Sequence, residues 1–230
     1  MTRHELSRRA VLTTGLSLAA ISQPMAAERA LRDLAAGKGV IYGAAIEPEI
    51  VDRDPDFRAL LRRQCASLTP ENAMKWNALR PTRDSFNFAA ADRVAALASA
   101  QGAAVHGHCL VWHEALPAWL PSALTPRTGV GLLTGHIRQV VGRYAGRVRS
   151  WDVVNEAVER NDGRPDGLRL SPWFRALGHD YLSLAFRTAH EVDPRARLAL
   201  SDYGLEYDDE RWMVEKRGTM LSLLENLKAA

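Results

Sequence analysis

Polar and aromatic side chains gather in three short segments of this 230-residue chain, at residues 69–76, 106–113 and 151–156. The third segment is an apolar run that ends in Asn155 and Glu156. A carboxylic acid there can protonate the leaving oxygen of a glycosidic bond and then deprotonate a water molecule. The neighbouring amide can hydrogen-bond a sugar hydroxyl. The alternative interpretation is structural, with Glu156 at a strand end capping the next helix.

The first segment places Glu71, Asn72 and Lys75 within five positions, next to Trp76. Carbohydrates need several directional hydrogen-bond donors and acceptors, and aromatic rings that cover the apolar face of each sugar. This combination favours a sugar-binding role. The alternative is a helix N-terminus with the Glu and the Asn in its first turn.

The second segment contains three histidines. His106 and His108 are two positions apart on an expected strand, so their imidazoles point the same way, and His113 lies nearby. Such a pair could ligate the metal of a barrel metallohydrolase. No further Asp or Lys ligand follows at an obvious later strand end. We therefore favour one buried, hydrogen-bonded histidine and one sugar-binding histidine, and we expect neither a metal nor a cofactor.

A scaffold of alternating strands and helices is expected to position these segments. We expect strands at residues 40–46, 67–69, 103–112, 148–154 and 196–200, and helices at 56–65, 90–100, 132–144, 173–192 and 211–227. This alternation predicts a parallel sheet with crossover helices. No glycine-rich phosphate loop opens a helix, which favours a barrel over a doubly wound sheet. The expected fold class is α/β, an incomplete (β/α)8 TIM barrel with about five of eight βα units.

Composition excludes several other classes of protein. With 47% hydrophobic and 25% charged residues, the chain has the mix of an ordinary globular protein. Its 30 basic and 27 acidic residues give a net charge of +3 and are spread along the chain, so we expect no nucleic-acid partner. Cys65 and Cys109 have no zinc-site spacing and cannot build a disulfide scaffold, so we expect two buried thiols.

Residues 1–27 resemble an export signal of the twin-arginine type. Arg8 and Arg9 precede an uncharged stretch at residues 10–25 that is too short and too interrupted to span a bilayer. We therefore expect export of the folded protein to the periplasm or beyond, and no membrane partner. The alternative is an amphipathic N-terminal helix.

Taken together, residues 69–76, 107–113 and 151–157 resemble glycoside hydrolase family 10, the barrel endo-1,4-β-xylanases. Shorter matches support the resemblance at residues 86–88, 91–92, 136–137, 143–144, 168–169, 171–173 and 180–181. The resemblance runs in the family's order from about residue 40 to the C-terminus. It implies that residues 28–230 form a partial catalytic barrel that cleaves internal β-1,4 bonds of xylan or xylo-oligosaccharides with retention.

The resemblance also implies roles for individual residues. Glu156 matches the general acid/base, and Asn155 matches the residue that contacts the 2-hydroxyl of the sugar at the cleavage point. Tyr203 matches a residue on the leaving-group side. Residues that hold the sugars on the non-reducing side are matched by Glu71, Asn72, Lys75, His108 and Trp112. Trp119 and Trp173 are expected to be packing residues.

The sequence departs from the family pattern in two ways. Four positions hold residues unusual for the family, namely Cys109, Ala115, Ser201 and Gly204. More seriously, the 230 residues contain neither the sixth-strand Gln-x-His pair nor the seventh-strand Thr-Glu-Leu-Asp type of motif that carries the nucleophile. Retention needs two carboxyl groups about 5–5.5 Å apart. We therefore expect a C-terminally shortened xylanase, with a non-catalytic remnant or xylan-binding fragment as the alternative.

Overall fold

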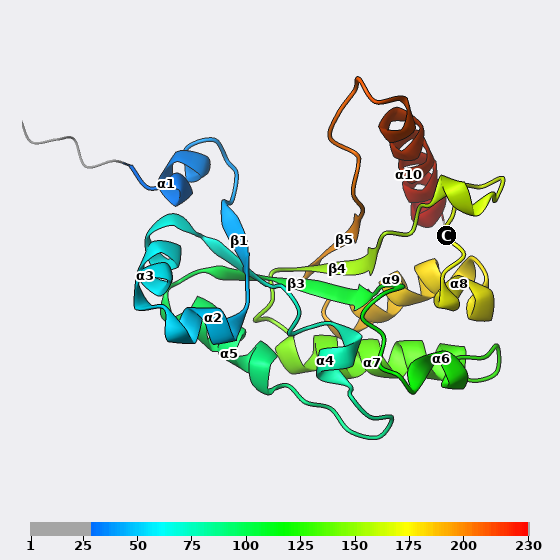
Figure 1. The fold of residues 1–230 in the computed structure, drawn as a ribbon, viewed down its shortest axis with the longest axis horizontal. Helices are drawn as coiled ribbons and strands as arrows, with labels where there is room; N and C mark the ends of the chain where they lie inside the picture. The colour runs from blue at the N-terminus through cyan, green and yellow to red at the C-terminus, as the bar shows by residue number, and fades with distance from the viewer. Residues whose placement is uncertain (1–28, 230) are drawn as a thin grey trace, which may run out of the picture.

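The computed structural model describes residues 29–229, so the expected export signal lies outside the described residues. Five parallel strands form one sheet in chain order (Figure 1). They are β1 (Gly43–Ile46), β2 (Ser67–Pro70), β3 (Ala104–Val111), β4 (Ser150–Asn155) and β5 (Arg197–Ser201). The α/β fold and the partial parallel barrel predicted from the sequence are confirmed.

Helices connect successive strands. The longer ones are α3 (Pro55–Gln64), α5 (Ala89–Ala100), α7 (Gly129–Tyr144), α9 (Asp180–Val192) and α10 (Arg211–Ala229). Shorter ones are α1 (Leu31–Ala36), α2 (Pro48–Arg53), α4 (Trp76–Leu79), α6 (Leu120–Ala123), α8 (Pro172–Leu177) and the 3-10 helix η1 (Arg160–Asp162). None of the helices within residues 29–229 is long and apolar enough to cross a bilayer.

The single helix expected at residues 173–192 is wrong, because the structure has two helices there. The side chain of Ser171 caps α8 by accepting a 3.1 Å hydrogen bond from the amide of Phe174, and Pro172 follows as the first helical residue. Gly178 ends the helix with a φ of 62°, a conformation that few residues other than glycine adopt. The helices α1, α2, α4 and α6 were not predicted, because four to six residues are too few to show a helical period.

One face of the sheet packs against the helices. Leu68, Val105 and Trp151 occupy successive strands on this face and are buried. Trp151 fits because its neighbour in the register of β3 and β4 is Gly107, where a Cβ would lie 2.2 Å from the indole ring. The close packing of Trp151 therefore requires glycine at position 107.

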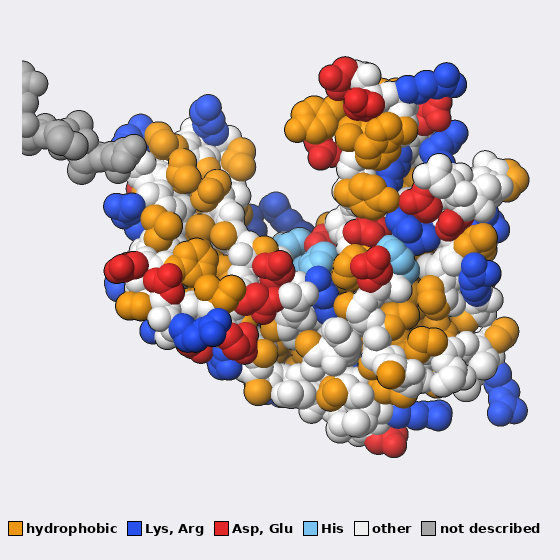
Figure 2. Space-filling model, viewed as in Figure 1, with side chains coloured by type: hydrophobic (Ala, Val, Ile, Leu, Met, Phe, Trp, Pro, Cys, Tyr) orange, Lys and Arg blue, Asp and Glu red, His pale blue; other side chains and the backbone are white. Residues whose placement is uncertain are grey.

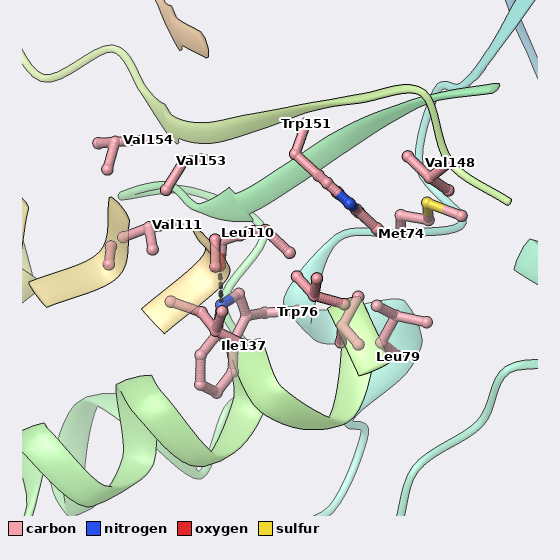
Figure 3. Packing of buried hydrophobic residues seen from close by; sticks show 14 of the residues in the cluster. Met74, Trp76, Leu79, Leu110, Val111, Ile137, Val148, Trp151, Val153 and Val154 are labelled. Atoms are coloured by element: carbon pink, nitrogen blue, oxygen red, sulfur yellow. Dashed lines mark hydrogen bonds between the residues drawn. The ribbon is translucent and has the colours of Figure 1, made fainter. Parts of the chain in front are cut away.

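Trp76 anchors the segment between β2 and α5 in this core. Its side chain is 2% exposed, and its Nε1 donates a 2.7 Å hydrogen bond to the carbonyl oxygen of Leu110 (Figure 3). Burial of an indole contributes about 2–3 kcal/mol. The contact fixes residues 71–75, which precede α4, against the end of β3.

The opposite face of the sheet is polar and lines a hollow. Ser67, Thr69, His106, His108 and Asp152 alternate along the strands with the buried apolar residues. Figure 2 shows the hollow between the side of the molecule formed by β1, α1 and α3 and the side formed by α10, with histidine side chains at its base. Among the described residues, β1 and β5 each pair with a strand on one side only.

Candidate active site

The carboxyl end of β4 holds Glu156 in an unusual backbone conformation. Its φ is 55°, in the left-handed region that non-glycine residues rarely occupy. Two hydrogen bonds fix this conformation. The amide of Glu156 donates to the carbonyl oxygen of Ser201 over 2.8 Å, and Nε of Arg169 donates to the carbonyl oxygen of Glu156 over 2.7 Å. A strained residue held by several contacts is typical of functional sites.

Three side chains surround the carboxylate of Glu156, which is 21% exposed. Nδ2 of Asn155 lies 3.5 Å from Oε1, while a guanidinium nitrogen of Arg169 and Nδ1 of His113 each lie 3.9 Å from Oε2. Burial lowers the pKa of His113, and the nearby Arg169 lowers it further, which disfavours the charged imidazolium beside Glu156. The carboxyl group thus combines limited solvent contact with nearby groups that can stabilise its ionised form.

A second cluster lies where β2 and β3 end. Nζ of Lys75 donates a 2.9 Å hydrogen bond to Oδ1 of Asn72, and Nδ2 of Asn72 donates to a carboxylate oxygen of Glu47. The same ammonium lies 4.8 Å from the ring centroid of Trp112. The structure therefore brings Asn72, Lys75 and Trp112 together, as donors and an acceptor around an aromatic ring. Glu71 lies in the same turn, and it is exposed.

A second tryptophan, Trp173, holds the backbone of Trp112 in place. Trp173, which is 1% exposed, donates a 2.9 Å hydrogen bond from Nε1 to the carbonyl oxygen of Trp112. Nε1 of Trp112 is buried and has no protein partner within residues 29–229. Trp119 donates to the carbonyl oxygen of Arg80 over 3.1 Å. The packing roles expected for Trp119 and Trp173 agree with these contacts.

His106 and His108 share one carboxylate. Oδ2 of Asp152 lies 3.0 Å from Nε2 of His106 and 2.9 Å from Nδ1 of His108, and the other ring nitrogen of His106 is 2.7 Å from Oγ of Ser150. Burial alone would raise the pKa of Asp152, but the hydrogen bonds from the two histidines outweigh it and hold that pKa well below its usual range. His108 thus has one nitrogen engaged, and its ring centroid is 6.3 Å from that of Trp112.

The structure describes no set of three His, Cys, Asp or Glu side chains that could hold a metal ion between residues 29 and 229. The metallohydrolase interpretation therefore has no ligand set in this part of the chain. Cys65 and Cys109 are both buried free thiols, as the sequence predicted. Burial raises the pKa of Cys109, which disfavours its thiolate form.

Tyr203 lies apart from the second cluster, in the loop after β5. Its hydroxyl donates a 3.1 Å hydrogen bond to Oε2 of Glu159. Arg169 lies between Glu159 and Glu156. One of its guanidinium nitrogens is 3.5 Å from Oε2 of Glu159 and 3.9 Å from Oε2 of Glu156. Tyr203 is therefore linked to Glu156 through two intervening side chains.

Sequence reasoning missed the residues that hold the expected ones in place. Glu47 follows β1 and pairs with Asn72, and its place at a strand end was a signal that could have revealed it. Asp152 and Arg169 lie in motifs that match the family, but the sequence analysis assigned them no function. The position of Ser201 beside Asn155 depends on strand register, which no local pattern specifies.

Comparison with known proteins shows which family this chain resembles. The model of glycosyl hydrolase family 10 matches residues 30–230. Endo-1,4-beta-xylanase A of Caldicellulosiruptor sp. (strain Rt8B.4) is 38% identical over 206 residues, covering 84% of this chain and 28% of that protein. Endo-1,4-beta-xylanase 3 of Hypocrea jecorina (strain QM6a) is 37% identical over 181 residues, covering 78% of this chain and 51% of that protein.

Solved structures agree. Xylanase 10B from Thermotoga petrophila RKU-1, crystallised in complex with xylobiose, superposes with a TM-score of 0.79 at 33% identity. The match covers 88% of this chain and 60% of that one, and this chain spans 28% and 51% of the length of the two xylanases above. The sequence motifs, the five-stranded parallel sheet and these matches lead to one conclusion. The chain belongs to glycosyl hydrolase family 10.

Proposed function

We propose that the protein is an endo-1,4-β-xylanase type of glycosidase, which cleaves internal β-1,4 bonds of xylan or xylo-oligosaccharides with retention. One observation carries the proposal. Glu156 directly follows Asn155, the last residue of β4, at the edge of the sheet where Asn72, Lys75 and Trp112 form a polar and aromatic cluster. The names of the relatives, and the xylobiose in one related structure, support this substrate class.

Glu156 is the proposed general acid/base. In the first step its carboxyl group protonates the leaving oxygen, and in the second its carboxylate accepts a proton from the attacking water. Arg169, with a guanidinium nitrogen 3.9 Å from Oε2, stabilises the carboxylate that forms after the first proton transfer. The side-chain amide of Asn155 donates to a hydroxyl of the sugar at the cleavage point.

The second cluster is the proposed binding site for sugars on the non-reducing side of the bond. Lys75 and Asn72 supply hydrogen bonds, and Trp112 supplies an aromatic face. Glu71 and His108 complete this site in the proposal, and Tyr203 binds the sugar on the leaving-group side. A pyranose needs such a combination, because its ring has hydroxyls around the edge and an apolar face.

A second candidate function keeps the sugar site without the cleavage. The 230 residues hold no segment like the family's nucleophile motif, and retention needs that second carboxyl group. The alternative candidate is a non-catalytic remnant or xylan-binding fragment that holds xylo-oligosaccharides without cleaving them. The binding cluster and Glu156 are the same in both candidates.

One experiment tests the proposal and separates the two candidates. Calorimetry would measure the binding of xylohexaose to the chain, and a reducing-end assay would measure cleavage under the same conditions. Binding with cleavage that Glu156→Gln lowers at least about a hundredfold supports the enzyme. Binding without cleavage supports the fragment. Absence of binding would contradict both.

We also propose that residues 1–27 direct export through the twin-arginine route to the periplasm or the extracellular space. Mass spectrometry of the protein expressed in a bacterium tests this idea. The expected result is a mature N-terminus near residue 28 in the exported fraction, and its disappearance when Arg8 and Arg9 are both replaced by Lys. Equal export of that variant would contradict the proposal.

A further inference from the structure

Four arginines gather at the edge of the sheet where β4 and β5 begin, opposite the edge that carries Glu156. Arg147 and Arg149 lie between α7 and β4, Arg195 lies between α9 and β5, and Arg197 is the first residue of β5. The two segments are neighbours, because the amide of Arg197 donates a 3.0 Å hydrogen bond to the carbonyl oxygen of Arg149. All four arginines are exposed. Basic residues that are distant in sequence thus form one group in the fold.

The four arginines line one open cavity of about 490 Å³. The other residues along its wall are small or apolar except for one carboxylate, and they are Ala104, Gly146, Val148, Asp193 and Ala196. Like charges close together repel one another unless an opposite charge lies among them. Four guanidinium groups beside one carboxylate leave the cavity with an excess of positive charge.

The carboxylate of Asp193 is already engaged by the protein. Its side chain is 2% exposed, and its two oxygens accept hydrogen bonds from the amides of Gly146, over 2.8 Å, and of Arg195, over 3.2 Å. Nε of Arg195 lies 3.9 Å from the same carboxylate. Asp193 therefore joins the two loops that carry the arginines, and its charge is buried beside Arg195 rather than exposed in the cavity.

Arg195 reaches from one loop to the other because position 146 is a glycine. Gly146 has a φ of 72°, and a Cβ built on it would lie 2.6 Å from a guanidinium nitrogen of Arg195. The guanidinium group thus packs directly against the backbone of the loop before β4. This contact places Arg195 next to the segment that carries Arg147 and Arg149.

We propose that this cavity binds a phosphate group, either as a free phosphate ion or as the head group of an anionic lipid. Guanidinium groups are planar and rigid, and their paired N–H donors match two oxygens of a phosphate at once. The negative charge of a phosphate offsets the excess positive charge among the four arginines, which a neutral sugar does not. The cavity is confined to two short loops, so it suits a single phosphate rather than the row of phosphates of a nucleic acid.

The phosphate site and the proposed sugar site lie at opposite ends of β4. Arg149 precedes the strand and Glu156 follows it, which separates them by about 20 Å of extended chain. A phosphate bound in the cavity therefore leaves the sugar site accessible, and a lipid head group there holds the protein with the sugar site facing away from the membrane. The phosphate site does not depend on the proposed function.

Titration with sodium phosphate at constant ionic strength, followed by NMR, tests the proposal. The backbone amide signals of Gly146 and Arg195 are expected to shift and to saturate, and sodium acetate at the same concentrations should shift them less, because it carries a single charge. The double variant Arg149→Gln/Arg197→Gln should weaken phosphate binding at least about tenfold, since each substitution removes a charged donor. Arg127→Gln, the same change of charge at an exposed position between α6 and α7, should have no effect.

Cosedimentation with vesicles distinguishes the two sources of the phosphate. Vesicles of phosphatidylglycerol mixed with phosphatidylcholine present an anionic head group, and vesicles of phosphatidylcholine alone, which are neutral overall, serve as the control. Other basic residues also attract an anionic surface, so the wild type is compared with the double variant. Weaker cosedimentation of the double variant identifies a lipid head group. Saturable phosphate binding with equal cosedimentation of the two proteins identifies the free ion.

A further pair of variants decides between the outcomes if the double variant fails to fold. Gly146→Asn places a side chain against the Arg195 guanidinium, and asparagine tolerates a positive φ better than most residues, so phosphate binding should weaken. Gly163→Asn is the matched control, because Gly163 has a φ of 74° and nothing within 4 Å of an added Cβ.

Three results would overturn the phosphate site. The first is the absence of a saturable shift with phosphate together with equal cosedimentation of the wild type and the double variant. The second is an equal loss of binding in Arg127→Gln, which would indicate an effect of overall charge. The third is acetate that binds as tightly as phosphate. Each would leave the proposed function standing, because binding of xylohexaose is measured separately and concerns the other end of β4.

Discussion

The hydroxyl of Ser201 donates a 2.9 Å hydrogen bond to Oδ1 of Asn155, across the pairing of β4 with β5. Because the carbonyl oxygen of the amide is engaged, its NH2 group points elsewhere, and Nδ2 lies 3.5 Å from a carboxylate oxygen of Glu156. Ser201 thus sets which end of the Asn155 amide faces the proposed acid.

Replacing Ser201 by Ala tests this positioning. The amide of Asn155 would be free to rotate, and loss of one hydrogen bond of about 1 kcal/mol should weaken xylo-oligosaccharide binding about fivefold. Calorimetry with xylotriose measures the change. Ser183→Ala on α9 is the control, since its hydroxyl bonds only to the carbonyl oxygen of Asp180. Unchanged affinity in the Ser201 variant would show that Asn155 is held by other contacts.

Lys75→Met separates the charge of Lys75 from its packing. The variant keeps an apolar stem over Trp112 but removes the ammonium that donates to Asn72. We expect affinity for xylotriose to fall about tenfold, since hydrogen bonds to charged groups contribute about 1.5–3 kcal/mol. Lys38→Met, at an exposed position after α1, should bind like the wild type. Equal affinities of the two variants for xylotriose would show that Lys75 does not bind the sugar.

Asp152 should make the folded state sensitive to acid. Its pKa in the folded state is lowered, because the hydrogen bonds from His106 and His108 outweigh the effect of burial. The stabilisation is therefore complete above the unfolded pKa of about 3.9 and is lost as the pH falls below it. Asp152→Asn should lower the free energy of unfolding by about 2–3 kcal/mol at pH 7 and by less at pH 3. Urea denaturation at both pH values measures this, and an equal loss at both would contradict the account.

His136 should add a second acid sensitivity at higher pH. It is fully buried and stacked on Trp76 at 3.6 Å between centroids, with neither ring nitrogen hydrogen-bonded among the described residues. Burial holds its pKa well below the ordinary value, and the nearby Arg80 adds to the effect. As the pH falls, His136 is therefore protonated in the unfolded chain at a higher pH than in the folded protein. The contribution of the neutral, buried His136 to stability is complete above about pH 6.5 and declines below it.

His136→Phe keeps the stacked ring and removes the proton site. We expect the variant to lose less stability than the wild type between pH 7 and pH 5, measured by urea denaturation. His190→Phe near the end of α9, on an exposed position, controls for the loss of a histidine as such. A pH dependence as steep as that of the wild type would show that His136 is not the titrating group.

The sequence predicted the strands well because each is a short apolar run followed by polar residues. The run that ends at Asn155 and Glu156 shows this pattern, and so does the run before Glu71. Helix boundaries were less predictable. Apolar residues recur on both sides of Gly178, so the period alone did not reveal the break between α8 and α9.

The candidate site could also be predicted only in part. Asn72, Lys75 and Trp112 could be predicted because they stand in long motifs, and the structure brings them together. The contacts that orient them come from residues distant in sequence. Glu47 is 25 positions from Asn72, and Ser201 is 46 positions from Asn155. Such pairs depend on strand register and on the packing of loops, which a local pattern does not determine.

The central claim is that Glu156 and the cluster around Trp112 line one sugar site. The most direct test follows backbone and indole N–H signals by NMR as xylotriose is added. Nε1 of Trp112 has no partner among the described residues, whereas Nε1 of Trp76 and of Trp173 each donate to a carbonyl oxygen in the protein. We predict that the Trp112 indole and the Glu156 amide shift with one midpoint while those of Trp76 and Trp173 stay in place. Binding that leaves both of the first two signals unmoved would contradict the account.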